Sequence, residues 1–244
     1  MSDLPPWRRH TARFQDRVLG LGATTLDFLH PFLDDLPAWP ISTELSDRAA
    51  LKFQVCLVTL GSLRSAREVA FSTSKLWLQG HFLLAATGFR TVQVLYGQLC
   101  WLEQKVLRPI EAGDLGVAHN RAVKVIFGSN TAIPHVRGGV GPHPLVNVMD
   151  FIRAAEAATP GLLEDYKFLC DSAHPSYMLQ SWLLFAGPDH DNWTNPTFAL
   201  QAEALLDRIV VAGETSINEI GIVAKDLMSR CVPEVRSETA SEGN

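Results

Sequence analysis

The side chains best suited to chemistry gather in one short segment that begins at Tyr166. Tyr166, Cys170 and His174 are spaced i, i+4 and i+8, so on an α-helix they form one ridge. Lys167 and Asp171 lie on the neighbouring ridge. An imidazole beside a phenol, an amine and a carboxylate could transfer a proton to or from a bound ligand. The segment therefore predicts a site with His174, Tyr166, Asp171 and Lys167 as its candidate catalytic residues.

Pro175 follows His174 and determines where the imidazole stands. Proline disfavours the helical conformation for the residue before it and suits the first position of a helix, so His174 is expected at a joint between two helices. There the imidazole could act as a general acid or base, or bind a ligand together with Ser176. It could equally be a buried pin that hydrogen-bonds backbone groups left unpaired at the joint. Both interpretations stay open.

Arg90 is a further candidate ligand-binding residue, because it is the only formally charged side chain between Leu76 and Leu102. A buried guanidinium needs a partner. The structural interpretation pairs it with an acid, whereas the functional one makes it an anion or phosphate clamp with Lys167 or Arg67. The acids proposed for the structural pair are Glu68, Glu164 and Asp171.

Neither a metal site nor a cofactor is predicted. The four cysteines stand far apart in the sequence: Cys56, Cys100, Cys170 and Cys231. They form no Cys-x-x-Cys pair, so reduced, buried thiols are the expected state. Cys170 could be a nucleophile beside His174, but its apolar neighbours favour inert packing. The loop Asp189-His190-Asp191 is a weak metal candidate, because adjacent loop residues seldom chelate one ion.

Composition and proline spacing predict an all-α helical bundle. With 47% hydrophobic and 19% charged residues, a chain of 244 residues can bury a sizeable core. Residues 43–69 and 75–105 are long runs without proline, separated by a short polar turn, and the sequence shows no clear strand alternation. Two such runs most simply form a long antiparallel hairpin, against which shorter C-terminal helices pack.

The predicted organisation is a single helical domain over residues 1–232. Glycines and prolines mark a loop-rich insert at about 109–145, which could be a lid over a small-molecule site. The acidic, serine-containing tail at residues 233–244 is predicted to be disordered.

The formal net charge of −5 gives no global attraction to phosphate backbones, so non-specific coating of DNA is excluded, while a local basic patch remains open. The stretch Leu76–Leu102 contains too many polar side chains to favour a membrane span. The amino terminus lacks the basic-then-apolar order of a secretory signal. A cytoplasmic location without membrane contact is expected.

Two stretches together resemble a broad family of uncharacterised, all-helical bacterial proteins. In that family, a helix with Leu-x-x-x-Gly, alanines and an arginine precedes the motif Tyr-x-x-Leu-Ser/Cys-x-x-x-His-Pro-Ser. The first stretch is carried by Leu76, Gly80, Ala85, Ala86 and Arg90. The second is carried by Tyr166, Leu169, Cys170, His174, Pro175 and Ser176. The resemblance covers residues 65–182.

The family is distantly similar to HEPN domains, helical bundles that dimerise and in many cases cut RNA with an arginine and a histidine on one helix. The resemblance implies a homodimer with RNA as a candidate partner and a binding or regulatory role in stress response or defence. The alternative is a metal-independent ribonuclease in which His174 is the general acid/base, and Lys167 and Arg90 hold the scissile phosphate. Lys167 stands where the nuclease pattern has arginine, and lysine does not form the same forked contact.

Overall fold

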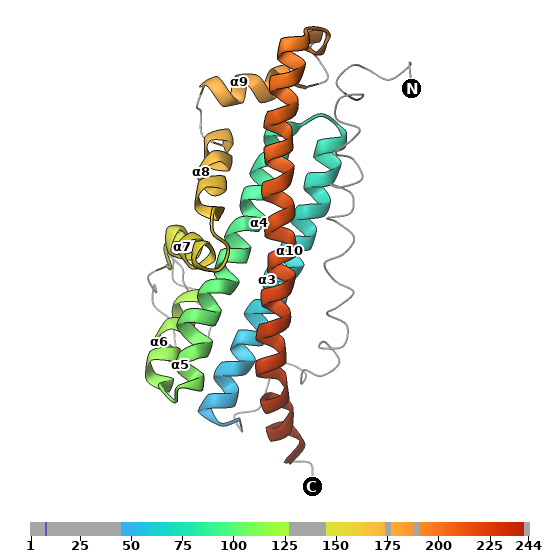
Figure 1. Ribbon diagram of the computed structural model, residues 1–244. Helices are drawn as coiled ribbons and strands as arrows, with labels where there is room; N and C mark the ends of the chain where they lie inside the picture. The colour runs from blue at the N-terminus through green and yellow to red at the C-terminus, as the bar shows by residue number, and fades with distance from the viewer. Residues whose placement is uncertain (1–7, 9–44, 127–144, 174–176, 188–190, 242–244) are drawn as a thin grey trace, which may run out of the picture.

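The proline-free, apolar runs of the sequence form the long helices of the molecule. The computed structural model describes residues 8, 45–126, 145–173, 177–187 and 191–241, and the described part contains helices and no strand (Figure 1). The all-α prediction is therefore confirmed. The elements are α3 (Asp47–Leu78), α4 (Phe82–Leu102), the π-helix η1 (Glu103–Leu107), α5 (Arg108–Glu111), α6 (Leu115–Ile126), α7 (Val148–Ala158), α8 (Leu162–Ala173), α9 (Tyr177–Phe185), the 3₁₀ helix η2 (Asp191–Thr194) and α10 (Pro196–Ser241).

Local signals set the start of α3 and the turn into α4. The hydroxyl oxygen of Ser46 accepts a hydrogen bond from the Ala49 amide at 3.3 Å, which caps the first turn of α3. Gly80 reverses the chain with a φ of 82°, a backbone conformation that favours glycine. Helix α4 then runs back along α3, and the Ser62 hydroxyl approaches Gln98 Oε1 at 3.5 Å between the two helices.

Helix α4 is the centre of the bundle. It packs against α3, α7, α8 and α10, and in Figure 1 it lies behind α10 with α3 on one side and α7 and α8 on the other. Four of its large side chains are fully enclosed, with 0% exposure for Phe89, Val92, Tyr96 and Leu99. Burial on this scale is the main source of stability in a helical bundle, because isolated helices are only marginally stable in water.

Two glycines allow helices to approach one another closely. A Cβ added at Gly97 of α4 would lie 2.7 Å from the carbonyl oxygen of Phe151 on α7. A Cβ at Gly213 of α10 would meet the ring of Phe89. At both positions a side chain would occupy space that a neighbouring helix already fills.

The sequence predicts a disordered tail from residue 233, whereas the structure includes residues 233–241 in a helix. Helix α10 continues through Pro233 to Ser241, although proline removes one helical hydrogen bond. Glu234 pairs with Arg48 at 2.9 Å and with the buried ammonium of Lys52 at 2.5 Å, and Val235 is 0% exposed. These contacts with α3 hold the last turns in place.

The predicted loop-rich insert at about 109–145 contains residues 109–111 of α5 and all of α6. Residues 127–144 of the insert lie outside the described part. Among the described residues, no helix is long and apolar enough to cross a membrane.

Gly97→Ala should lower the free energy of unfolding by about 1–3 kcal/mol, because the new methyl group meets backbone that cannot move without separating α4 from α7. Gly61→Ala is the matched control, since the added methyl would have no atom within 4 Å. It should raise stability by about 0.5–1 kcal/mol through helix propensity. Urea denaturation followed by circular dichroism measures both. Equal stabilisation by the two variants would contradict the close approach of α4 and α7.

Candidate functional site

Arg90, which is partly exposed, meets the buried Tyr166 between α4 and α8. The guanidinium Nη2 of Arg90 donates to the Tyr166 hydroxyl at 3.3 Å, and its carbon lies 5.5 Å from the centre of the tyrosine ring. Tyr166 is only 5% exposed. Two residues predicted for one site are thus brought together, although they stand far apart in the sequence.

The electrostatics of this pair follow from burial and from the hydrogen bond. The bond to Tyr166 raises the pKa of Arg90, so the guanidinium is charged. Burial raises the pKa of Tyr166, and the charge-assisted bond from Arg90 opposes that effect. Cys170, one turn after Tyr166 and partly buried, raises the pKa of Tyr166 further. The phenol is a neutral acceptor for Arg90, not a proton donor poised near neutral pH.

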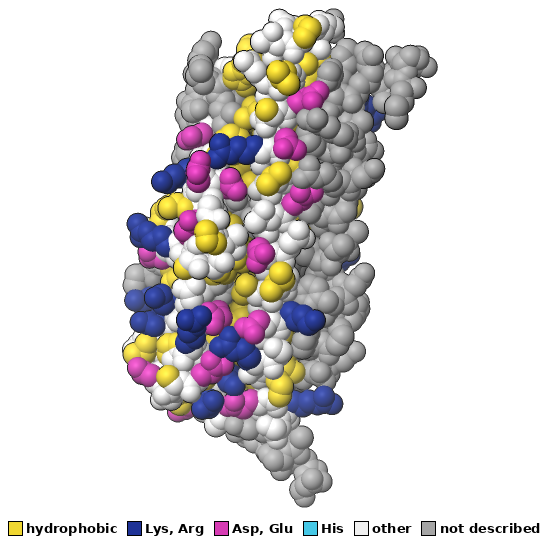
Figure 2. Space-filling model, in the orientation of Figure 1, with side chains coloured by type: hydrophobic (Ala, Val, Ile, Leu, Met, Phe, Trp, Pro, Cys, Tyr) yellow, Lys and Arg dark blue, Asp and Glu magenta, His cyan; other side chains and the backbone are white. Residues whose placement is uncertain are grey.

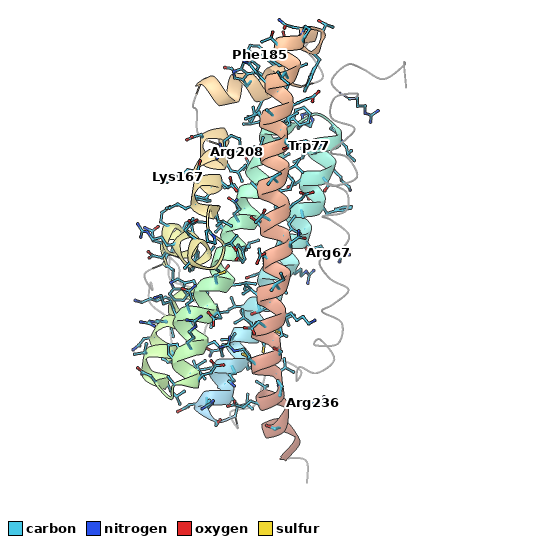
Figure 3. All side chains as sticks on the ribbon, viewed as in Figure 1. Arg67, Trp77, Lys167, Phe185, Arg208 and Arg236 are labelled. Atoms are coloured by element: carbon cyan, nitrogen blue, oxygen red, sulfur yellow. The ribbon has the colours of Figure 1, made fainter. Side chains whose placement is uncertain are left out.

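The other two described candidates of the predicted catalytic set lie on a different face of α8. Lys167 and Asp171 are exposed, whereas Leu162, Tyr166 and Leu169 face the core. Figure 3 shows Lys167 on the outer side of α8 and Arg208 between α8 and α10. The expected joint site is therefore split, with Tyr166 inside the bundle and the lysine and carboxylate in solvent. His174 and Ser176 lie outside the described residues.

The predicted acidic partner of Arg90 is not found among the described residues. Glu164 turns to α10, where it lies 3.5 Å from Arg208, and Arg208 also reaches Asp165 at 3.7 Å. A phenol replaces the carboxylate because Tyr166 is the polar side chain that α8 directs at α4. The guanidinium is thus held by a neutral partner, and its Nε is buried without a hydrogen bond to the described residues.

Gln93 adds a second polar group to the same helix. It is 0% exposed, and neither its amide nitrogen nor its amide oxygen has a hydrogen-bond partner in the described part of the chain. A buried amide without partners costs stability. Arg90 and Gln93 are spaced i and i+3, so α4 carries two incompletely satisfied polar groups on adjoining positions of one face.

A basic groove lies between η1, α6 and α7. It has a volume of about 440 Å³. Its lining residues are Trp101, Gln104, Lys105, Arg121, Lys124, Asp150, Arg153 and Ala154. Among the described residues, four cations thus line the groove with one carboxylate, in a chain whose net charge is −5. Figure 2 shows Lys and Arg side chains gathered over the part of the surface where Figure 1 places α6 and α7.

Side-chain bonds to backbone fix the walls of the basic groove. Arg121 of α6 donates to the carbonyl oxygen of Lys105 at 3.1 Å, and Gln104 donates to the carbonyl oxygen of Ala154 on α7 at 3.0 Å. The π-helix η1 takes part in both bonds, because it contains the Lys105 acceptor and the Gln104 donor. Its wider turn changes the direction in which successive side chains point. Trp101 is 8% exposed and forms the floor. The packing of η1, α6 and α7 therefore fixes the shape of the groove.

Sequence reasoning missed the basic groove because its cations come from three separate elements. Arg121 and Lys124 are spaced i and i+3, which indicates one helix face. Lys105 and Arg153 join them only through the packing of η1 and α7. The helical spacing in α6 was the one signal available from the sequence.

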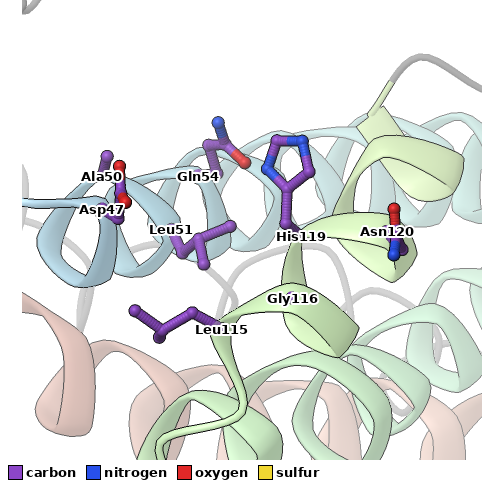
Figure 4. A pocket seen from close by; sticks show the side chains of 8 residues that line it. All are labelled: Asp47, Ala50, Leu51, Gln54, Leu115, Gly116, His119 and Asn120. Atoms are coloured by element: carbon purple, nitrogen blue, oxygen red, sulfur yellow. The ribbon is translucent and has the colours of Figure 1, made fainter.

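A second cavity of about 510 Å³ separates the first turns of α3 from α6 (Figure 4). Asp47 and Gln54 face His119 and Asn120 across it. The polar groups described there are one carboxylate, one imidazole and two amides, so the cavity has no cluster of side chains with the same charge. Among the described residues, no group of three or more His, Cys, Asp or Glu side chains could hold a metal ion.

Comparison with protein-family models, with curated proteins and with solved structures finds no match to this chain.

Gln93→Met should raise the free energy of unfolding by about 1–3 kcal/mol, because a side chain of similar length replaces a buried amide that has no partner. Thermal and urea denaturation measure the change. Tyr166→Phe is the contrasting variant: it removes the acceptor of Arg90 and should lower stability by about 1.5–3 kcal/mol. A loss of stability in Gln93→Met would show that the amide is hydrogen-bonded in solution.

Proposed function

We propose that this protein binds single-stranded nucleic acid, with RNA as the expected ligand, and that it is a binding or regulatory protein. The basic groove carries this proposal. Phosphodiester backbones present one negative charge per nucleotide, and neutralising them with lysine and arginine releases condensed counterions. Lys105, Arg121, Lys124 and Arg153 provide that charge in a concave surface.

The dimensions of the basic groove favour a single strand. A cavity of about 440 Å³ walled by three helical elements is too small for a duplex, but it has room for about one nucleotide of a single strand. Arginine supports such contacts with a planar fork that matches phosphate oxygens, and Arg121 is already oriented by its bond to the Lys105 carbonyl.

The lining of the basic groove favours binding over cleavage. Among the described residues, its lining contains no histidine, tyrosine or cysteine, and the one carboxylate there, Asp150, is paired with Arg153 at 3.2 Å. None of these described side chains is suited to remove a proton from a 2′-hydroxyl. The ribonuclease alternative would need His174 together with Lys167 and Arg90. Lys167 is exposed on the outer side of α8, whereas Arg90 of α4 contacts Tyr166 on the inner side of α8.

Replacing Lys105 and Lys124 together by glutamine should weaken binding of a fluorescent single-stranded RNA about tenfold, or about 0.7 kcal/mol for each charge removed. The slope of log Kd against log salt should fall by about 0.7 for each lost phosphate contact. Arg64→Gln with Lys75→Gln is the control, because it removes two exposed charges from α3. Fluorescence anisotropy across salt concentrations measures both. Equal weakening by the two double variants would refute the assignment to the basic groove.

Single-stranded DNA of the same sequence and a duplex RNA complete the panel and distinguish the ligands. The RNA should be recovered intact without added metal. RNA cleavage that disappears in a folded His174→Ala variant would instead establish the ribonuclease alternative. The relation to HEPN domains stays a prediction in either case.

A further inference from the structure

Helix α10 exposes a straight line of large apolar side chains on its outward face. Leu200 is 72% exposed, Val211 42% and Ile222 62%. Each is eleven residues from the next, and eleven residues make three helical turns plus about 20°. The three side chains therefore point in nearly the same direction, away from the buried face that carries Leu206, Ile209, Ile220 and Leu227.

The positions between these three are mostly small and uncharged. Ala204 and Asn218 are exposed and Thr215 is partly exposed on the same outward face. Figure 1 places α10 in front of the bundle, and Figure 2 shows hydrophobic side chains spaced along that front surface. Single exposed apolar residues are ordinary, but three in register along one helix form a surface that another helix can cover. We call the six residues named here and above, Leu200, Ala204, Val211, Thr215, Asn218 and Ile222, the α10 stripe.

We propose that the α10 stripe is the interface of a homodimer in which α10 packs in parallel against α10 of a second copy. The partner must present a long helix with apolar side chains at the same spacing, and α10 itself is such a helix. An eleven-residue repeat fits nearly straight or slightly right-handed packing of two helices. The stripe residues carry no charge, so two copies can meet there without burying an unpaired ion.

Charged residues beside the α10 stripe favour the parallel over the antiparallel arrangement. By helical position, Asp207, Glu214 and Lys225 lie on one flank, and Arg208 and Asp226 on the other. In a parallel two-fold dimer opposite flanks meet, which sets Lys225 against Asp226, and Arg208 against Asp207, of the other copy. An antiparallel dimer centred on Val211 would instead set Asp207 against Glu214 twice, a like-charge contact.

Arg208 pairs with Glu164 and Asp165, and Asp226 pairs with Arg230, within the same chain. Their side chains are still 43% and 52% exposed, so a second copy can reach them. The proposed dimer goes beyond nucleic-acid binding and does not depend on it. The basic groove is formed by η1, α6 and α7, and the α10 stripe shares no residue with it.

Cysteine cross-linking of the full chain tests both the interface and its orientation. In the parallel dimer, Leu200→Cys alone should form a disulfide-linked dimer with a mild thiol oxidant, and Ile222→Cys alone should do the same. The unsubstituted chain is the control for its native thiols, three of which are buried. A cross-link that appears only when Leu200→Cys and Ile222→Cys proteins are mixed would overturn the parallel orientation in favour of the antiparallel one.

Sedimentation velocity over a range of about 1 µM to 1 mM measures association independently. Val211→Glu should raise the dimer Kd about tenfold or more, while leaving the circular dichroism spectrum unchanged, and the Tm unchanged at concentrations where both proteins are monomeric. Leu184→Glu is the matched control, because Leu184 on α9 is 61% exposed and lies outside the stripe. A chain that is monomeric at every concentration would overturn the proposal. So would a Tm that falls in Val211→Glu at concentrations where both proteins are monomeric, since it would show that a segment of the same chain covers the stripe.

Discussion

The enclosure of α4 by four other helices is the constraint on which the rest of the structure depends. At the buried positions of α4, each residue must match a neighbouring helix in size and polarity. Glycine at position 97 admits the backbone of α7, and glycine at 213 on α10 admits the ring of Phe89. The positions of α7 and α10, and with them the basic groove and the α10 stripe, follow from these contacts with α4.

Arg90 is a partly buried side chain whose contact across to α8 is with a neutral group. A tyrosine hydroxyl is a less costly partner than a carboxylate, because it requires no second charge to be desolvated. Tyr166 accepts from Arg90 and also places its ring near the guanidinium. Arg90 therefore joins α8 to α4.

The sequence predicts well those features that depend on neighbouring residues. Long proline-free runs indicate α3 and α4. Features that depend on distant residues are harder to predict. Composition makes the end of the chain look disordered, yet Lys52 and Arg48, nearly two hundred residues earlier, hold Glu234 in a helix. On α8 the spacing groups Tyr166 with Lys167 and Asp171, but the apolar Leu162 and Leu169 decide which side turns inward.

The charge of the basic groove depends on where the acids of the molecule are engaged. The first residue of η1, Glu103, turns toward α10, where it accepts hydrogen bonds from Arg108 at 2.9 Å and Arg230 at 3.2 Å.

Arg230 also binds Glu111 at 2.6 Å, and this contact holds the pKa of that carboxyl below its ordinary value. These carboxylates are therefore neutralised at the base of the bundle, away from Lys105 two residues along η1. The π-helix thus separates the charges: its acid stabilises the packing of α10, while its lysine faces the basic groove with the cations of α6 and α7. An acidic protein can in this way keep one concave surface positive, because its negative charges already have partners elsewhere.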